Sequence, residues 1–170
     1  SGNYMVFFPS YDYMITIYEL MDIPVHIQKR VMNEEERKSY VDEFKEDSNI
    51  LSFSILGGLF SEGIDLVGDR LSGVIVIGVG FPGISDKNRL LQDKFSFDYA
   101  YSYPGFNRVL QSAGRLIRHE EDQGVVLLVD SRFNNSFYRS LYPREWKNIS
   151  YTDNDMDMIN VMNSFYESHL

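Results

Sequence analysis

The most hydrophobic run of the sequence, GVIVIGVGF at residues 73–81, limits the possible folds more than any other feature. It contains no charged residue and is followed by Pro82, a pattern typical of a strand buried on both faces of a parallel sheet. We expect it to be the central strand. Three further apolar runs, at residues 4–8, 49–56 and 124–133, and a short alternating segment at residues 25–28 predict the other strands.

Helical patterns separate these runs, which indicates an α/β fold built from βαβ units. We expect helices at about 11–20, 33–47, 86–94, 106–118, 136–142 and 156–170. Ser10 directly precedes the first of them and is a favourable N-cap, with Asp12 in the first turn where the helix dipole favours an acid. The helix at 86–94 is expected to flank the central strand.

Composition limits the class of protein. With 170 residues, of which 44% are hydrophobic, the chain can form one domain with a sizeable core. Zero cysteines exclude disulfides and thiolate ligands, and the three histidines (His26, His119, His169) are far apart, so we expect no metal site. The absence of a long apolar stretch predicts a cytoplasmic protein, of bacterial intracellular type, with no membrane partner.

The segment QSAGRLIR, at residues 111–118, carries the strongest sign of chemistry. On a helix, Arg108, Gln111, Arg115 and Arg118 fall within an arc of about 80°. The opposite side holds the apolar residues Phe106, Val109, Leu110, Ala113, Leu116 and Ile117. Several arginines on one rigid element suit phosphate oxygens, although a solvated basic face balanced by residues 120–122 (EED) explains the same pattern.

Two predicted turns follow strands and suit ligand binding. The turn at Pro9 and Ser10 offers a hydroxyl and backbone amides to a phosphate. The stretch GGLFSEGIDL, residues 57–66, combines three glycines with Ser61, Glu62 and Asp65, so backbone and carboxylates can approach a ligand. Plain connecting loops remain an alternative for both turns. Because the net charge is −9, any contact with nucleic acid must be local.

An aromatic stretch, FSFDYAYSY at residues 95–103, has two interpretations. Its rings could stack on nucleic-acid bases, or they could pack within the core or against another domain. The following Pro104 and Gly105 are expected to break the chain before the arginine helix.

Four segments in order, GNYMVFFPSYDYM, GGLFSEGIDLVGD, VIVIGVGFP and YPGFNRVLQSAGRLIRHEEDQGVVLLVDSRF, resemble the C-terminal motor domain of the XPD and DinG group of superfamily 2 DNA helicases. The resemblance extends from Asn3 to about Trp146. It implies a RecA-like three-layer α/β domain, with a mostly parallel central sheet flanked by helices on both faces. It also implies that residues 1–170 are the second RecA-like domain of a longer helicase, with residues 147–170 as a C-terminal extension packed on it.

The resemblance implies a role for particular residues. Gln111, Arg115 and Arg118 match the motif that faces the nucleotide on the partner motor domain, with the two arginines as candidates for stabilising charge on the γ-phosphate. Glu62, Gly63 and Asp65 match the nucleotide-linked motif V. Ser10 and Tyr11 match a motif that meets the DNA backbone, and Ser61 is assigned to DNA binding with them.

The resemblance is incomplete in one respect. The chain has no GxxxxGK[ST] phosphate loop and no DEAH-type acid box. We therefore expect ATP and Mg²⁺ to be bound mainly by an N-terminal motor domain of the same polypeptide, with single-stranded DNA as the other partner. An iron-sulfur cluster is possible in the full-length protein but not in this chain. A stand-alone α/β module that binds a nucleotide or phosphate is the alternative, and a phosphate loop upstream in the gene would decide between the two.

Overall fold

The computed structural model describes residues 2–45, 47–62, 71–116 and 123–168. The chain divides into two compact units, Ser1–Asp130 and Ser131–Leu170. The first unit contains the sheet and all the candidate site residues that are described. Each unit is described by itself below.

The sheet of the first unit has five parallel strands in the order β2-β3-β1-β4-β5. These are β1 (Tyr4–Phe8), β2 (His26–Ile27), β3 (Leu51–Ile55), β4 (Gly73–Ile77) and β5 (Val125–Val129). All five predicted strands are confirmed, but β1 and not β4 is central. The long apolar run of β4 misled the prediction, because its last four residues form the loop on which a helix packs.

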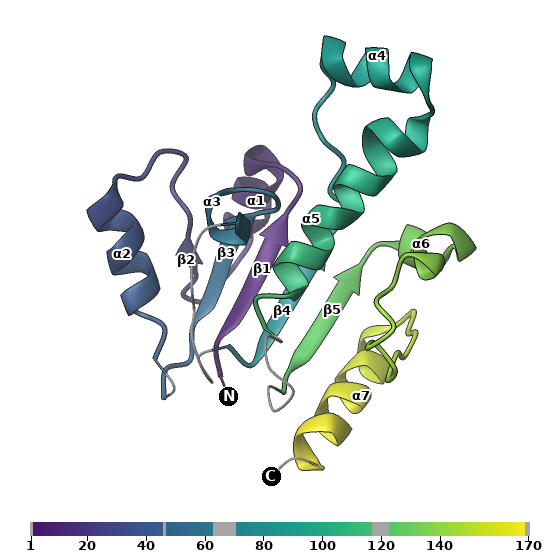
Figure 1. The fold of residues 1–170 in the computed structure, drawn as a ribbon. Helices are drawn as coiled ribbons and strands as arrows, with labels where there is room; N and C mark the ends of the chain where they lie inside the picture. Colours follow the sequence, from purple (N-terminus) through teal and green to yellow (C-terminus); the bar gives the residue numbers. More distant parts are fainter. Residues whose placement is uncertain (1, 46, 63–70, 117–122, 169–170) are drawn as a thin grey trace. The chain divides into compact units, whose positions relative to one another are not determined.

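Helices connect the strands and cover both faces of the sheet (Figure 1). They are α1 (Tyr11–Tyr18), α2 (Glu34–Asp42), α3 (Leu59–Glu62), α4 (Asp86–Lys94), the π-helix η1 (Asp98–Ser102) and α5 (Tyr103–Ala113). Helix α1 packs on β1 and β3, while α5 crosses β4 on the other face and contacts α3. The predicted α/β architecture with helices on both faces is confirmed.

Side chains alternate between the two faces along each strand, as the period of two requires. Val6, Phe8 and Phe53 are buried together with Met14 of α1. On the opposite face, the hydroxyl of Tyr40 in α2 hydrogen-bonds to Ser52 Oγ and, at 3.1 Å, to Ser54 Oγ. The small serines of β3 thus leave room for a tyrosine whose polar atom is satisfied. Burial raises the pKa of Tyr40 above its usual value.

Helix α4 does not flank the sheet as predicted. It has no buried residue, and Figure 1 shows α4 and the start of α5 projecting beyond the carboxyl ends of the strands. Pro104 and Gly105 do not break the chain either, since η1 runs directly into α5 and Pro104 lies in the first turn of α5. Proline is tolerated there because the first helical N–H groups need no intrahelical acceptor.

The second unit contains the 3₁₀ helix η2 (Ser131–Asn134), α6 (Ser136–Ser140) and α7 (Asp155–Glu167). Phe133 packs edge-on against Tyr138, and the Tyr142 hydroxyl donates to the Phe133 carbonyl at 2.9 Å. The ring of Trp146 lies 5.4 Å from that of Tyr142. Burial raises the pKa of Tyr142 to about 12.

Candidate functional site

The turn after β1 is built as the sequence predicts. Ser10 is the N-cap of α1, and its Oγ accepts a hydrogen bond from the Tyr13 amide at 3.2 Å. A serine hydroxyl that accepts a capping bond keeps its own proton for donation. Since Ser10 is exposed, it can donate that proton to a phosphate oxygen while capping the helix.

A cation that the sequence analysis missed lies beside this turn. The guanidinium of Arg30 stacks over the ring of Tyr11 at 4.4 Å, and its Nη2 lies 2.9 Å from Asp12 Oδ1. Arg30 is 18 residues from Asp12, so no local pattern indicates the contact. The arrangement places one cation next to the proposed phosphate-binding hydroxyl.

The second predicted turn follows β3. Gly57 has φ +69°, a left-handed conformation that favours glycine, and the Gly58 amide donates to the Ile55 carbonyl at 3.0 Å. The backbone of Ser61 and Glu62 belongs to the short helix α3. Of the other residues predicted here, Gly63 and Asp65 lie outside the described residues.

Two glycines bring α5 against the loop after β4. A Cβ atom on Gly105 would lie 2.6 Å from the Val79 carbonyl oxygen, and one on Gly80 would lie 2.9 Å from the Gly105 carbonyl oxygen. Both distances are too short for a side chain, so helix and loop are in direct backbone contact. This contact sets the depth at which the predicted arginine helix sits on the sheet.

The sequence predicted that Arg108 points outward in a row of guanidiniums. The structure shows that it does not. It is half-buried, and its Nη1 donates to the Gly80 carbonyl at 3.4 Å. A Cβ on Gly57 would lie 2.6 Å from Arg108 Cδ and Nε, so the arginine stem passes directly over that turn. Arg108 therefore ties α5 to both the turn after β3 and the loop after β4.

The predicted helix also ends early. Helix α5 stops at Ala113 with Gly114 as its C-cap, and Arg115 lies in the following turn, where its amide donates to the Ser112 carbonyl at 3.2 Å. Glycine is a poor helix former and favours termination. Gln111 is exposed on the last turn of α5, Arg115 is half-buried, and Arg118 lies outside the described residues.

The apolar side of this helix is mostly as predicted. Phe106, Val109, Ala113 and Leu116 are buried. Leu110 is only half-buried, and Ile117 lies outside the described residues. The stripe therefore holds the helix on the sheet, as its spacing indicates.

The candidate residues fall into two places and not one. Ser10, Tyr11 and the Gly57 turn follow strands and lie at the carboxyl edge of the sheet. Arg115 precedes Leu116, whose side chain would contact a Cβ on Gly124 at the amino end of β5. Helix α5, roughly 16 Å long for its residues, joins the two edges, and Arg108 connects it to the carboxyl edge.

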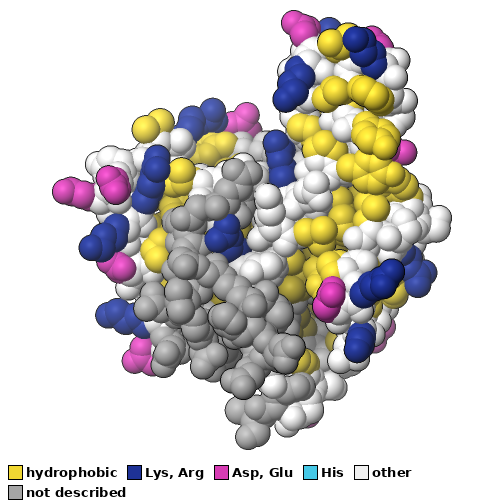
Figure 2. Space-filling view, in the orientation of Figure 1, with side chains coloured by type: hydrophobic (Ala, Val, Ile, Leu, Met, Phe, Trp, Pro, Cys, Tyr) yellow, Lys and Arg dark blue, Asp and Glu magenta, His cyan; other side chains and the backbone are white. Residues whose placement is uncertain are grey.

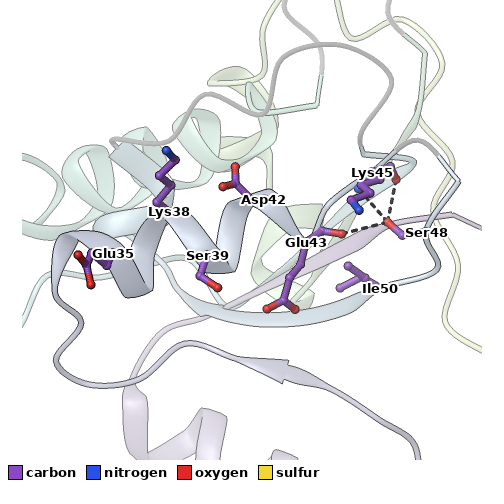
Figure 3. Close-up of a pocket in the computed structure, with 8 residues that line it drawn as sticks. All are labelled: Glu35, Lys38, Ser39, Asp42, Glu43, Lys45, Ser48 and Ile50. Carbon is purple, nitrogen blue, oxygen red and sulfur yellow. Dashed lines mark hydrogen bonds between the residues drawn. The ribbon is translucent and has the colours of Figure 1, made fainter.

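An open pocket lies elsewhere (Figure 3). It is about 690 Å³ in volume and is lined by Glu35, Lys38, Ser39, Asp42, Glu43, Lys45, Ser48 and Ile50. Lys45, Ser48 and Ile50 precede β3, so the pocket lies at the amino edge. Cations and carboxylates are mixed in its wall, which gives no single sign of charge for a ligand, and no predicted site residue lines it.

Within the described parts of the chain, no three His, Asp or Glu side chains are grouped so as to hold a metal ion. The described residues also contain no helix that is long and apolar enough to cross a membrane. At the strand-end turns, the described residues thus provide the exposed hydroxyl of Ser10 and the arginines Arg30 and Arg108, and no cluster of metal ligands.

Such a parallel α/β unit with an arginine-bearing helix is the class of domain found in RecA-like motors. The chain belongs to the helicase C-terminal domain family, whose model matches residues 1–149. A probable ATP-dependent helicase of Methanocaldococcus jannaschii is 26% identical, over 93% of this chain and 28% of its own length. The ATP-dependent DNA helicase XPD of Sulfolobus acidocaldarius is 26% identical, over 81% of this chain and 26% of its own length.

Solved structures agree with this assignment at the level of the fold. An apo XPD structure matches 82% of this chain and 30% of its own chain, with 24% identity and a TM-score of 0.69. The chain thus spans less than a third of these relatives. The resemblance to XPD-type helicases noted in the sequence, and the RecA-like fold that it implies, are confirmed.

Proposed function

We propose that this chain is the second motor domain of an ATP-dependent DNA helicase, which supplies charge-stabilising arginines and DNA-backbone contacts for translocation and unwinding in DNA repair or replication. The family membership supports the general function. The observation that carries the finer proposal is the path of α5, which has Gln111 in its last turn, is followed by Arg115, and is tied by Arg108 to the strand-end turns.

The DNA-binding part of the proposal rests on the carboxyl edge. Ser10 donates to a backbone phosphate, and Arg30, which stacks on the Tyr11 ring and is paired with Asp12, offers its remaining N–H groups beside it. Ser61, in the short helix α3, completes the proposed set. Contacts of this kind position a strand without reading its sequence. We assign single-stranded DNA to this edge.

The nucleotide part rests on the far end of α5. Arg115 and Arg118 approach the γ-phosphate held by the N-terminal motor domain, with Gln111 beside them and Glu62, Gly63 and Asp65 linking nucleotide state to the DNA edge. Guanidinium groups stabilise the charge that develops on the transferring phosphoryl group. Mg²⁺, when bound by the other domain with ATP, supplies further charge neutralisation there.

The first test is Arg115→Ala in the full-length enzyme. Loss of such an arginine lowers turnover by a factor of about 10³ or more, equal to roughly 4 kcal/mol. Because Arg115 follows the end of α5, the thermal midpoint should stay close to that of the parent. DNA-stimulated ATP hydrolysis at the parent rate would refute the catalytic role.

Phe106→Ala is the matched control on the buried side of the same helix. Phe106 is 2% exposed, and its truncation should cost about 3–5 kcal/mol of stability through a core cavity. Enzyme that remains folded should keep its turnover. Unfolding of the Arg115→Ala variant to the same extent would mean that the arginine is structural.

The alternative is a self-sufficient α/β module that binds a nucleotide or phosphate at the strand-end turns, where the Ser10 hydroxyl is exposed. It predicts ATP binding by this chain alone. The helicase proposal instead places the main ATP site on another domain, treats residues 147–170 as an extension of this one, and assumes an intracellular enzyme. An iron-sulfur cluster, if present, would belong to another part of the protein.

A further inference from the structure

A row of exposed aromatic rings lies on the projection formed by α4, η1 and the start of α5. Phe95, Tyr99 and Tyr103 are 66%, 62% and 37% exposed. Their ring centroids are 5.9 Å apart for the first pair and 5.4 Å for the second. We call these three residues the aromatic row. Figure 2 shows hydrophobic side chains gathered over this projection, with both basic and acidic side chains around them.

The sequence pattern explains why the row is exposed. Aromatic residues occur at every second position from 95 to 103. On a helical turn, residues two apart fall on opposite sides and residues four apart on the same side, so Phe95, Tyr99 and Tyr103 lie together. On the other side, Phe97 and Tyr101 stack at 5.0 Å; Tyr101 is 6% exposed and Phe97 is 47% exposed. Phe81 packs against both of them. Phe81, Phe97 and Tyr101 thus form one packed set of rings on this side of the projection.

The backbone under the row is unusual. Residues Asp98–Ser102 form a π turn, closed by the Tyr103 amide donating to the Asp98 carbonyl. Such turns are rare and often occur at functional sites. The π turn therefore marks the row independently of its exposure.

Charge and position indicate what would cover the row. The projection carries the three cations Lys87, Arg89 and Lys94 and the three acids Asp86, Asp93 and Asp98, so it is neutral, although the whole chain has a net charge of −9. The projection extends beyond the carboxyl ends of the strands, and Ser10, which follows β1, and Arg30, which stacks on Tyr11, lie at that edge of the sheet. Exposed rings on a neutral projection next to this edge suit a single strand, whose bases stack on aromatics while its phosphates meet the lysines and the arginine of α4.

We propose that the aromatic row is a stacking platform for the bases of single-stranded nucleic acid. The proposal rests on the function proposed above, since it extends the DNA path from the strand-end turns onto the projection. Stacking needs only a π face, so the platform binds without strong sequence preference. The exposed Ile84 and Leu90 nearby also fit a protein partner, and the test separates that possibility.

The test uses the chain and a single-stranded oligothymidylate with one 2-aminopurine, whose fluorescence reports stacking, at low salt. Tyr99→Leu and Phe95→Leu keep an apolar side chain but remove the ring. Each should weaken binding by about 5- to 150-fold and alter the fluorescence change. An abasic strand of the same length should bind parent and variants equally, because it has phosphates but no bases.

Leu90→Ala is the matched control, as it removes exposed apolar surface on α4 without removing a ring; its affinity should equal that of the parent. Equal DNA affinity of the parent and Tyr99→Leu would refute the stacking platform. It would leave the helicase proposal standing, because that proposal is tested by the ATPase turnover of Arg115→Ala. Equal binding of base-bearing and abasic strands by the parent would also overturn the stacking platform. So would sedimentation showing that Tyr99→Leu abolishes self-association and leaves DNA affinity unchanged.

Discussion

Arg108 is the residue at which the structure changes the chemical interpretation most. A guanidinium that packs on a glycine turn and donates to a backbone carbonyl is a tether, whereas an outward one is a ligand. It also connects the two places where candidate residues lie. Arg115 and Gln111 remain the described candidates for the phosphate.

At the residue scale, Glu36 provides a test of pH dependence. It closes the capping box of α2 with Asn33 and lies 2.7 Å from Lys29 Nζ. The Lys29 hydrogen bond, and after it the Asn33 amide, lower the pKa of Glu36 below 4.5. The stabilisation is therefore present above the unfolded value and is lost as pH falls through the lower folded value.

The measurement is an NMR pH titration of the Glu36 carboxyl carbon and the Asn33 amide. We expect the midpoint below 4.5 in the parent and closer to 4.5 in Lys29→Met, which lacks the ammonium donor. Glu36→Gln should remove the transition at Asn33. A parent midpoint at or above 4.5 would show that the capping box does not hold the charged carboxylate in solution.

At the scale of elements, the turn after β3 and helix α5 form one interlocked unit. Gly57→Ala places a Cβ 2.6 Å from Arg108 Cδ and imposes φ +69° on a residue with a side chain. We expect a loss of about 1–3 kcal/mol in the free energy of unfolding. Urea denaturation measures it.

The double variant separates the two causes. Arg108→Ala in the Gly57→Ala background should recover the steric part of the loss but not the backbone strain, so the two effects should be non-additive. Strict additivity would mean that Arg108 leaves the turn in solution and does not tether it.

The crossing of α5 over the β4 loop predicts a second loss of stability. Gly105→Ala would improve helix propensity, but its Cβ would lie 2.6 Å from a backbone oxygen of Val79 that cannot retract alone. We expect a net loss of about 1–3 kcal/mol. Gly83→Ala is the control, since no atom lies within 4 Å of its Cβ, and it should change stability by less than about 0.5 kcal/mol. Equal thermal unfolding of the two variants would contradict the close crossing.

At the scale of the whole molecule, net charge and the missing phosphate loop determine behaviour. With a charge of −9 and local cations only, this chain alone should bind single-stranded DNA weakly and with a steep salt dependence. It should show no ATPase activity, because no GxxxxGK[ST] loop is present in the sequence. Fluorescence anisotropy across a salt series and a coupled ATPase assay measure both. DNA-stimulated turnover by this chain would disprove the proposal that the main ATP site lies on another domain.

Much of the fold follows from local patterns. The five strands, the Ser10 cap and the buried stripe of Phe106, Val109 and Ala113 were all predictable, because strand period, capping and helical spacing act over a few residues. The family resemblance was predictable for the same reason, since its motifs are short and ordered. These features do not depend on which strands become neighbours.

Tertiary structure decided the rest. Three features depend on contacts between residues distant in the sequence: the central position of β1, the stacking of Arg30 on Tyr11, and the packing of Arg108 over Gly57. Periodicity placed Arg108 on the polar side of its helix, but only the folded chain brings a glycine turn without a side chain against it. Sequence therefore determined which residues can carry charge to a phosphate, and packing between distant segments determined which of them remain available to do so.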